Sequence, residues 1–434
     1  MAKSSSNTLA IQGGKAVRTA PLPLEFPGVH YIDDAEIEAA TRVLRSRSLF
    51  RYYGIDLQSE VKSFEREFAD FVGTRHAIAV ASGTGALHTA LSALGAGPGQ
   101  EIIVPAYLWV SVVAAVVNHG AIPVLADIDG TFCLDPAEVE RQITGRTRGI
   151  IMVHMSGAPG DVPAVRAIAD RHGLFLLEDC AQCAGGSIGG RKVGSFGDIS
   201  IFSFQMNKNM TAGEGGCVAT NDDELARRAV ACHDLGYARD ADGRLIMDDA
   251  GLKLWGRGYR LDELRAAVLR VQLERLPATT AAMRGSKYRI RRALESFPLV
   301  RLRKMIDPEG DTGCFLITTY PDAATARRVN AALIAEGIVT FPQGKSNILM
   351  TDWGLHLYYN NLSLIHRASN DRGGFPWTLE ANAGLARRYD KGTCPAADSL
   401  FERSILLAIP SNLTPEDEDD IVRAFEKVLQ ALSQ

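Results

Sequence analysis

The chain has 434 residues, of which 46% are hydrophobic and 23% are charged, and its formal net charge is −4. These values are typical of a globular protein with a substantial core and room for two domains, and the small charge gives no indication of nucleic acid or an anionic membrane as a partner. The start lacks a signal-peptide pattern, and the longest largely apolar run, Val110–Val117, is too short to span a bilayer. We therefore expect a cytoplasmic protein.

Two helices with acidic starts are predicted first, over 33–45 and 58–72, with an aromatic loop at 48–54 between them. From residue 77, short apolar runs alternate with helical patterns. The predicted strands cover 78–81, 101–104, 123–126, 149–153, 174–178, 199–202 and 217–220. The predicted helices between them cover 84–94, 109–118, 136–142, 162–171 and 222–235. Apolar strands that alternate with helices indicate an α/β fold with a mostly parallel sheet covered on both faces.

A long helical segment over 261–295 follows and is interpreted as a connector. Strands at 314–319 and 404–409 with helices at 322–336 and 415–432 predict a smaller α/β unit. We therefore expect a large domain over 1–275, including an N-terminal arm, and a small C-terminal domain over 276–434. The stretch 344–378, rich in Asn, Gly, Tyr and Trp, is predicted to be an irregular insert with a functional role.

Seven cysteines at irregular spacing argue against a disulfide framework. Cys180 and Cys183 have CxxC spacing, but no second pair of cysteines or histidines accompanies them. We therefore predict no metal site and interpret both as packing residues.

One lysine, Lys208, lies between an apolar strand and a glycine-rich turn in FSFQMNKNMTAGEGG, residues 202–216. Burial there would lower the pKa of its amine, and a neutral amine can attack an aldehyde. This chemistry suggests Schiff-base formation with pyridoxal phosphate. The alternative is a lysine that caps a turn and faces water, so the choice depends on the rest of a cofactor site.

Ligands of open parallel sheets bind beyond the carboxyl ends of the strands. The turn at 81–86 could cradle a phosphate on its backbone amides or serve only as a helix cap. Asp179 ends an apolar strand and could meet a protonated pyridine nitrogen, or instead pair with an arginine or cap a helix. Trp109 could stack on a pyridine ring or pack in the core. Ser203 could bind a phosphate or a backbone group.

The segments SGTGAL, VPAYLW, LLEDCAQ, GSFGDISIFSFQMNKNMTAGEGG and YRLDELRAAVLRVQLERL resemble, in sequence and in order, the DegT/StrS family of vitamin-B6-dependent aminotransferases that act on keto-sugars and aminocyclitols. The resemblance covers essentially the whole chain. It implies the aspartate-aminotransferase type of fold, pyridoxal 5′-phosphate as cofactor, and a homodimer with active sites at the subunit interface.

The resemblance also implies roles for individual residues. Lys208 would be the Schiff-base lysine, Asp179 the partner of the pyridine nitrogen, Gln182 a contact of the ring hydroxyl and Trp109 the stacking ring. The phosphate would be held by three small residues, Gly83, Thr84 and Ser203. Relatives commonly have an asparagine where this chain has Gly258, which leaves Arg257 or Ser82 as its replacement.

A lysine at position 208, where dehydrating relatives have a histidine, favours amino transfer. The aromatic and amide side chains of the insert suit a polyhydroxylated ring and resemble the branch that acts on ketones such as scyllo-inosose, with L-glutamine or L-glutamate as donor. The predicted substrate contacts are Tyr53, His356, Tyr358 and Asn360. Three alternatives stay open: a nucleotide keto-sugar as substrate, elimination or dehydration at the same site, and a non-catalytic cofactor-binding regulator.

Overall fold

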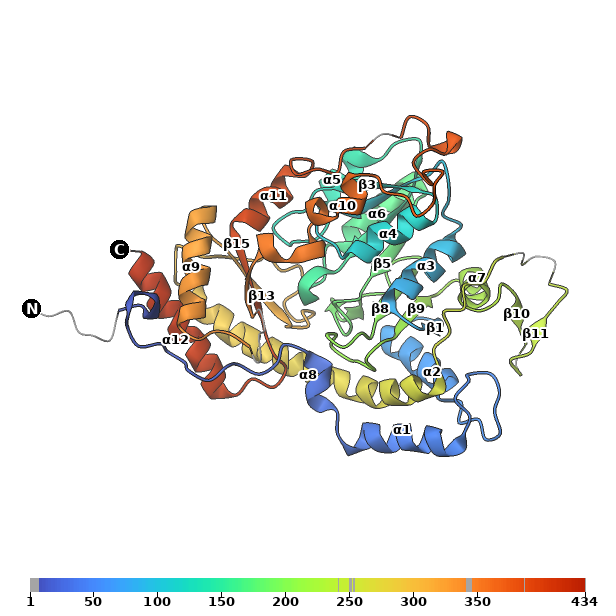
Figure 1. Cartoon of the computed structure of the whole chain (residues 1–434), viewed down its shortest axis with the longest axis horizontal. Helices are drawn as coiled ribbons and strands as arrows, with labels where there is room; N and C mark the ends of the chain where they lie inside the picture. Colours follow the sequence, from blue (N-terminus) through green and yellow to red (C-terminus); the bar gives the residue numbers. More distant parts are fainter. Residues whose placement is uncertain are drawn as a thin grey trace, which may run out of the picture.

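A computed structural model describes residues 8–240, 242–249, 252, 254–340, 346–385 and 387–433. Its larger sheet has the strand order β1-β9-β8-β5-β4-β2-β3, and β9 alone runs against its neighbours (Figure 1). The strands are β1 His76–Val80, β2 Glu101–Pro105, β3 Ile122–Ala126, β4 Thr147–Val153, β5 Phe175–Asp179, β8 Ile199–Ser203 and β9 Gly216–Thr220. The predicted mostly parallel sheet is confirmed, with strand ends within two residues of those expected.

Helices connect these strands and cover the sheet. They are α3 Gly83–Leu94, α4 Val110–Asn118, α5 Pro136–Gln142, α6 Val162–His172 and α7 Asp223–His233. Several begin at a side chain that accepts a backbone N–H, as Asp222 does from Leu225 at the start of α7. Side chains alternate along β1, so that Ile78 and Val80 face the cluster that contains α3, while Ala79 faces the cluster that contains α2 (Glu60–Val72).

A second, four-stranded antiparallel sheet lies beside the first, in the order β12-β13-β15-β14. Its strands are β12 Arg301–Leu302, β13 Phe315–Thr319, β14 Asn347–Leu349 and β15 Ser404–Ala408. Helices α9 (Ala323–Ala335) and α12 (Pro415–Leu432) pack on it near the chain ends (Figure 1). Other elements are α1 Asp34–Ser46, α10 Leu362–Ile365, α11 Pro395–Glu402 and two short hairpins, β6 Ser187–Ile188 with β7 Arg191–Lys192 and β10 Ala238–Arg239 with β11 Leu245–Ile246.

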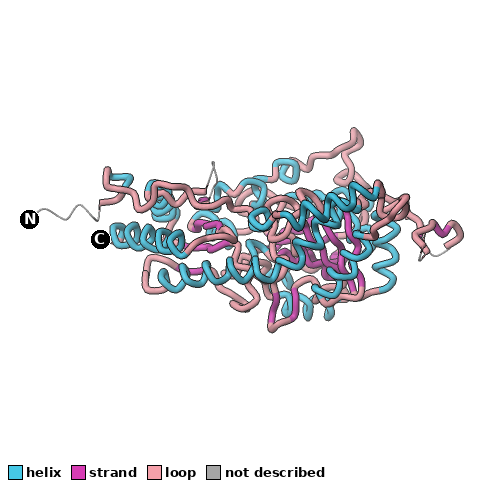
Figure 2. The backbone as a smooth tube through the Cα atoms, turned by 90° about the horizontal axis from the view of Figure 1, so that it is seen from below, coloured by secondary structure: helices cyan, strands magenta, loops and turns pink. Residues whose placement is uncertain are grey.

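One long helix, α8 (Glu263–Leu294), runs along both sheets, and the strands form two separate groups above it (Figures 1 and 2). Leu269 and Leu276 in its first half pack in the core of the large sheet. Met283 and Ile290 in its second half pack in the core of the small sheet. We propose that the boundary between the two units lies within α8 near residue 276, in line with the expected limit at 275.

Two segments pack across this boundary, contrary to expectation. Leu9 and Leu22 of the N-terminal arm lie in the core of the small unit, whereas the arm was expected to belong to the large domain. Met350, Leu357 and Tyr358 lie in the core of the large sheet, whereas the insert was expected to belong to the small domain. Isolated anchoring residues carry no periodic pattern, so the sequence gives no signal for either contact.

The predicted irregular insert contains one regular element, strand β14, which pairs with β15 in the small sheet. The rest consists of short 3-10 turns at Met350–Asp352, Gly354–His356 and Tyr358–Asn360, helix α10 and loops, and residues 344 and 345 lie outside the described residues. Within the described ranges, no helix combines the length and the apolar character that a membrane crossing requires.

Candidate active site

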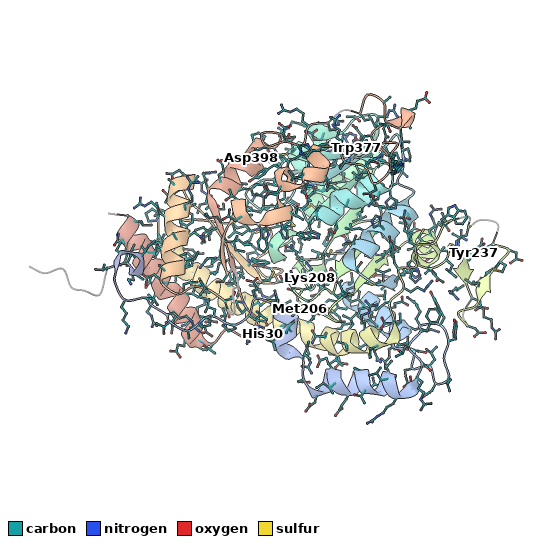
Figure 3. All side chains as sticks on the ribbon, in the orientation of Figure 1. His30, Met206, Lys208, Tyr237, Trp377 and Asp398 are labelled. Carbon is teal, nitrogen blue, oxygen red and sulfur yellow. The ribbon has the colours of Figure 1, made fainter. Side chains whose placement is uncertain are left out.

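A cavity of about 390 Å³ opens at the carboxyl ends of β4, β5 and β8. Its lining contains all seven residues predicted to bind the cofactor: Gly83, Thr84, Trp109, Asp179, Gln182, Ser203 and Lys208. Figure 3 shows Lys208 near the middle of the molecule, between the two units. The structure therefore brings these residues together, while their individual roles stay predictions.

Asp179 is the last residue of β5 and is 4% exposed. Burial raises the pKa of its carboxyl, and the N–H of Ala181, 2.9 Å from Oδ1, together with Lys208 and His154 offsets part of that rise. A desolvated carboxylate gains most from a cation that lies beside it. Asp179 is thus suited to hold a protonated ring nitrogen.

His154 and Glu178 form a buried hydrogen-bonded pair next to the end of β5. His154 Nδ1 accepts the N–H of Gly160, so its Nε2 donates to Glu178 at 3.1 Å. The Glu178 oxygens also accept three backbone N–H groups, those of Gly194, Phe196 and Gly197. With Cys180, the pair forms a group of potential metal ligands within 4.8 Å of one another, but these bonds already occupy the carboxylate. We interpret the pair as a structural support.

Lys208 lies in the turn after β8, and its carbonyl accepts the N–H of Gly28 from the N-terminal arm at 3.2 Å. Burial lowers the pKa of its amine, as the sequence predicted, while Asp179, Cys314 and Glu214 raise it in part. A lowered pKa increases the fraction of neutral, nucleophilic amine at a given pH.

The N-terminus of α3 forms an anion cradle. Ser82 caps the helix by accepting the N–H of Gly85 at 3.0 Å, and the Thr84 hydroxyl lies 2.9 Å from that of Ser111. A Cβ on Gly83 would lie 2.7 Å from Cβ of Ser203, so only glycine allows the two backbones to approach this closely. Helix N-terminal amides and hydroxyls favour a phosphate, so this cradle fits that part of pyridoxal phosphate.

Trp109 and His356 form the aromatic side of the cavity. Trp109 is 44% exposed, and its ring centroid lies 4.8 Å from that of His356, which stacks on Trp353 at 4.6 Å. Burial lowers the pKa of His356 to about 4. Its Nδ1 donates to the carbonyl of Trp353, and its Nε2 accepts from Nε2 of Gln182. Both ends of the Gln182 amide are thus bonded, because its Oε1 accepts the N–H of Ser156.

Of the four predicted substrate contacts, His356 lines the cavity and the other three are absent from its described lining. Tyr53 is 72% exposed, and its ring packs against Phe50. Tyr358 is fully buried and donates to Asp398, which gives it a packing role, and its substrate contact stays a prediction. Asn360 donates to the carbonyl of Gly354 and lines a separate groove beside α4.

The two proposed replacements for the missing asparagine are both bonded within the chain. Ser82 caps α3, and an Arg257 guanidinium nitrogen lies 3.3 Å from Nε2 of His119. Gly258 itself has φ 70°, a left-handed conformation that favours glycine. The left-handed backbone conformation therefore explains why this position holds a glycine.

The sequence reading missed several polar residues of the cavity region: the amides of Gln205, Asn207 and Asn209, the hydroxyl of Ser111 and the carboxylates of Glu25 and Glu214. Ser111 and Glu214 line the cavity, and Glu25 of the N-terminal arm lines an adjoining recess that also touches Lys208. Ser111 and Glu214 lie close in sequence to predicted residues, which is a usable signal. Glu25 has no such signal in the sequence, because only the tertiary structure brings the N-terminal arm to the site.

The fold and the cavity together identify the class of proteins to which this chain belongs. A mostly parallel sheet that presents a buried aspartate, a desolvated lysine and a phosphate cradle at one carboxyl edge is the architecture of the aspartate-aminotransferase-like, pyridoxal-phosphate-dependent enzymes. The solved structure of 3-amino-5-hydroxybenzoic acid synthase superposes on this chain with a TM-score of 0.76 at 30% identity, covering 96% of this chain and all of that one.

Residues 30–343 match the DegT/DnrJ/EryC1/StrS aminotransferase family, and the chain belongs to that family. An L-glutamine:2-deoxy-scyllo-inosose aminotransferase of Streptoalloteichus tenebrarius is 43% identical over 284 residues, 64% of this chain and 65% of that protein, which is just under two thirds of its length. A protein of the same name from Streptomyces kanamyceticus is 37% identical over 98% of this chain and 97% of its own. A GDP-perosamine synthase of Vibrio cholerae is 38% identical over 55% of this chain and 64% of its own.

Proposed function

We propose that this protein is a pyridoxal-phosphate-dependent aminotransferase that moves an amino group from L-glutamine or L-glutamate to the ketone of a cyclitol resembling scyllo-inosose. The observation that carries the proposal is the shared cavity of Asp179 and Lys208, in which each group shifts the pKa of the other. The names of the relatives from Streptoalloteichus tenebrarius and Streptomyces kanamyceticus support the choice of donor and of ketone.

When bound, pyridoxal phosphate would supply an aldehyde that captures amines and a ring that withdraws electrons from the neighbouring carbon. Asp179 would hold the ring nitrogen, Trp109 would flank the ring, and the α3 cradle would hold the phosphate. Nζ of Lys208, which burial biases toward its neutral form, would carry the proton between the α-carbon of the donor and the aldehyde carbon of the cofactor. Such proton transfer contributes roughly 10²–10⁴ in rate.

The charged groups that line the cavity favour a ketone substrate without a negative charge. Lys208 is the only lysine or arginine in its described lining, whereas Asp179 and Glu214 are both acids. A polyhydroxylated ring can hydrogen-bond to such a lining, but a diphosphate would lack a cation from this part of the chain. The second candidate, a nucleotide keto-sugar, is favoured by the similarity to the GDP-perosamine synthase.

We further propose that two copies of the chain form a homodimer with shared active sites. Several large apolar side chains are exposed, namely Ile55, Trp109, Met247 and Trp255, the last of them to 93%. The hairpin β10–β11 projects from the large unit, and Tyr237 just before it is exposed and lies far from Lys208 (Figures 1 and 3). Exposed apolar patches of this kind mark interaction surfaces. Sedimentation equilibrium of the holoenzyme would show a dimer, whereas a monomer that retains full activity would contradict shared sites.

The function is tested by incubating the holoenzyme with L-glutamine in the absence of any ketone. An aminotransferase converts its cofactor to the amine form, which is visible as loss of the yellow absorbance, whereas a dehydratase or a regulator leaves the absorbance unchanged. The amine-loaded enzyme is then offered keto-cyclitols and nucleotide keto-sugars. Turnover of the cyclitols alone supports the first proposal, and turnover of nucleotide sugars alone replaces it with the second.

A further inference from the structure

A chain of hydrogen bonds joins the irregular insert to the wall of the active-site cavity. It begins at the carbonyl of Trp353, which accepts from Nδ1 of His356 at 2.9 Å. Nε2 of His356 lies 3.2 Å from Nε2 of Gln182, whose Oε1 accepts the backbone N–H of Ser156 at 2.9 Å. Gln182 and His356, the two middle members of the chain, line the cavity together with Lys208.

The two ends of this chain fix the direction of every bond in it. A backbone carbonyl only accepts, so the proton of a neutral His356 ring is on Nδ1 and Nε2 is left as an acceptor. A backbone N–H only donates, so the Gln182 atom that faces Ser156 is the oxygen and the atom that faces His356 is the nitrogen. The NH₂ group of Gln182 has two hydrogens, and one of them goes to His356. Within the described part of the chain the second hydrogen has no acceptor, so it is available to a ligand in the cavity.

Both neighbours of the Gln182 amide are held firmly by the fold. The ring of His356 stacks on that of Trp353 with an interplanar angle of 14°. Burial lowers the pKa of His356 to about 4, so the ring is neutral at pH 7 and Nε2 keeps its lone pair. On the other side, Ser156 and Tyr107 are fully buried, and their hydroxyls lie 2.8 Å apart. The amide therefore has two fixed anchors, one from each end of the chain of bonds.

The strand order places Gln182 on the side of the cofactor ring that carries the ring oxygen. In pyridoxal phosphate the aldehyde lies opposite the ring nitrogen, with the ring oxygen on one side of it and the phosphate arm on the other. In the proposed arrangement Asp179 at the end of β5 holds the nitrogen, and the α3 cradle beside the ends of β1 and β8 holds the phosphate. Gln182 reaches the opposite way, to Ser156 beyond the end of β4. The ring oxygen therefore faces Gln182.

We infer that His356 is a positioning residue, which holds the Gln182 amide so that its free N–H donates to the ring oxygen of the cofactor. This inference rests on the proposed function, since it requires pyridoxal phosphate on Lys208. A hydrogen bond to a charged oxygen stabilises the charge. The ring oxygen is most negative when the Lys208 nitrogen that is bonded to the cofactor has lost its proton, because no positive charge then lies beside it. The amide thus lowers the pH at which that proton is lost, and the insert helps to set the acid–base properties of the reacting centre.

The test is a pH titration of the absorbance of the holoenzyme, because loss of this proton moves the absorbance of the bound cofactor to shorter wavelength. Gln182→Leu removes the donor, and hydrogen bonds to charged groups are strong enough that we expect the midpoint to rise by about one to two pH units. His356→Phe keeps a flat ring beside Trp353 and removes the acceptor, and we expect a rise of about half a unit to one unit. His356→Gln keeps an acceptor and removes the ring, so its rise should be less than half that of His356→Phe.

A double variant shows whether His356 acts through the amide. His356→Phe combined with Gln182→Leu should shift the midpoint no further than Gln182→Leu alone, because the positioned group is then absent. His366→Phe, at an exposed histidine of the same insert, is the matched control and should keep the wild-type midpoint. The other titratable groups that line the two spaces beside Lys208 are the same in all of these variants: Glu25, Asp179, Glu214 and Cys314.

Three results would overturn the inference: a wild-type midpoint in folded His356→Phe, a His356→Gln midpoint that rises as far as that of His356→Phe, or a double variant whose shift is the sum of the two single shifts. Failure of the proposed function looks different. L-Glutamine would then leave the yellow absorbance of the wild type unchanged, whatever the order of the midpoints.

Discussion

Gln182 donates from its side-chain Nε2 to Nε2 of His356, 3.2 Å away, and this bond joins the end of β5 to the irregular insert. The bond requires an unprotonated Nε2, which agrees with the lowered pKa of His356. Two residues that are 174 positions apart in sequence thus fix each other's orientation at the wall of the cavity.

This relationship predicts a pH dependence of stability. Burial lowers the pKa of His356 from its ordinary value of 6.5 to about 4 in the folded protein. Between these values the unfolded chain binds a proton that the folded chain does not, so the free energy of unfolding falls as the pH drops from 6.5 toward 4. His356→Asn should reduce this slope by up to about one proton. Urea unfolding from pH 7 to pH 4.5 measures it, with the exposed His366→Asn as the control. An identical slope in the wild type and His356→Asn would contradict the prediction.

Replacement of Lys208 by alanine removes the only lysine of the described cavity lining. We expect loss of the yellow species that borohydride reduces, and a fall in turnover of at least ~10²–10⁴ because the proton carrier is gone. The exposed Lys62→Ala should keep both properties. Normal turnover in Lys208→Ala would refute the assigned role.

Gly83→Ala should weaken cofactor binding. The added Cβ would lie 2.7 Å from Cβ of Ser203 and 2.9 Å from its Oγ, so the cradle must open. Overpacking of this kind costs about 1–3 kcal/mol, which corresponds to roughly fivefold to 150-fold in the Kd for pyridoxal phosphate. Gly145→Ala, where an added Cβ meets nothing within 4 Å, is the matched control. Equal affinities in the two variants would show that the close approach does not shape the cradle.

Tyr358→Phe separates packing from substrate contact. The hydroxyl of Tyr358 donates to Oδ1 of Asp398 at 2.9 Å and accepts the N–H of Cys394. Its removal leaves buried polar groups short of a partner, so we expect the free energy of unfolding to fall by about 1–3 kcal/mol. The KM values for both substrates should stay at those of the wild type. A large rise in KM with unchanged stability would restore the substrate contact expected from the sequence.

The sequence predicts the strands of the large sheet and most of the longer helices, and it places the candidate cofactor residues at one edge, because each of these depends on local signals. Strands β12 and β14 and helix α11 are not among the predicted elements. Asp179 and Ser203 lie at the ends of apolar strands, and Gly83 opens a helix directly after a strand, so the order of elements alone places them at one edge. The substrate side has no such signal. Glu25 reaches the recess through the path of the arm, and Tyr358 turns inward because Asp398, 40 positions later, is its partner. Contacts of this kind depend on tertiary packing, which periodicity does not encode.

The continuity of α8 couples the melting of the two units. A single helix contributes Leu269 and Leu276 to one core and Met283 and Ile290 to the other, so neither core can lose its share of the helix without weakening the next turns. Fraying at one end of the molecule therefore propagates along this helix to the other, across Pro277, which has no N–H and leaves one bond of the helical ladder unmade. Heat or denaturant should disrupt both sheets in one concerted step, although each has its own set of strands.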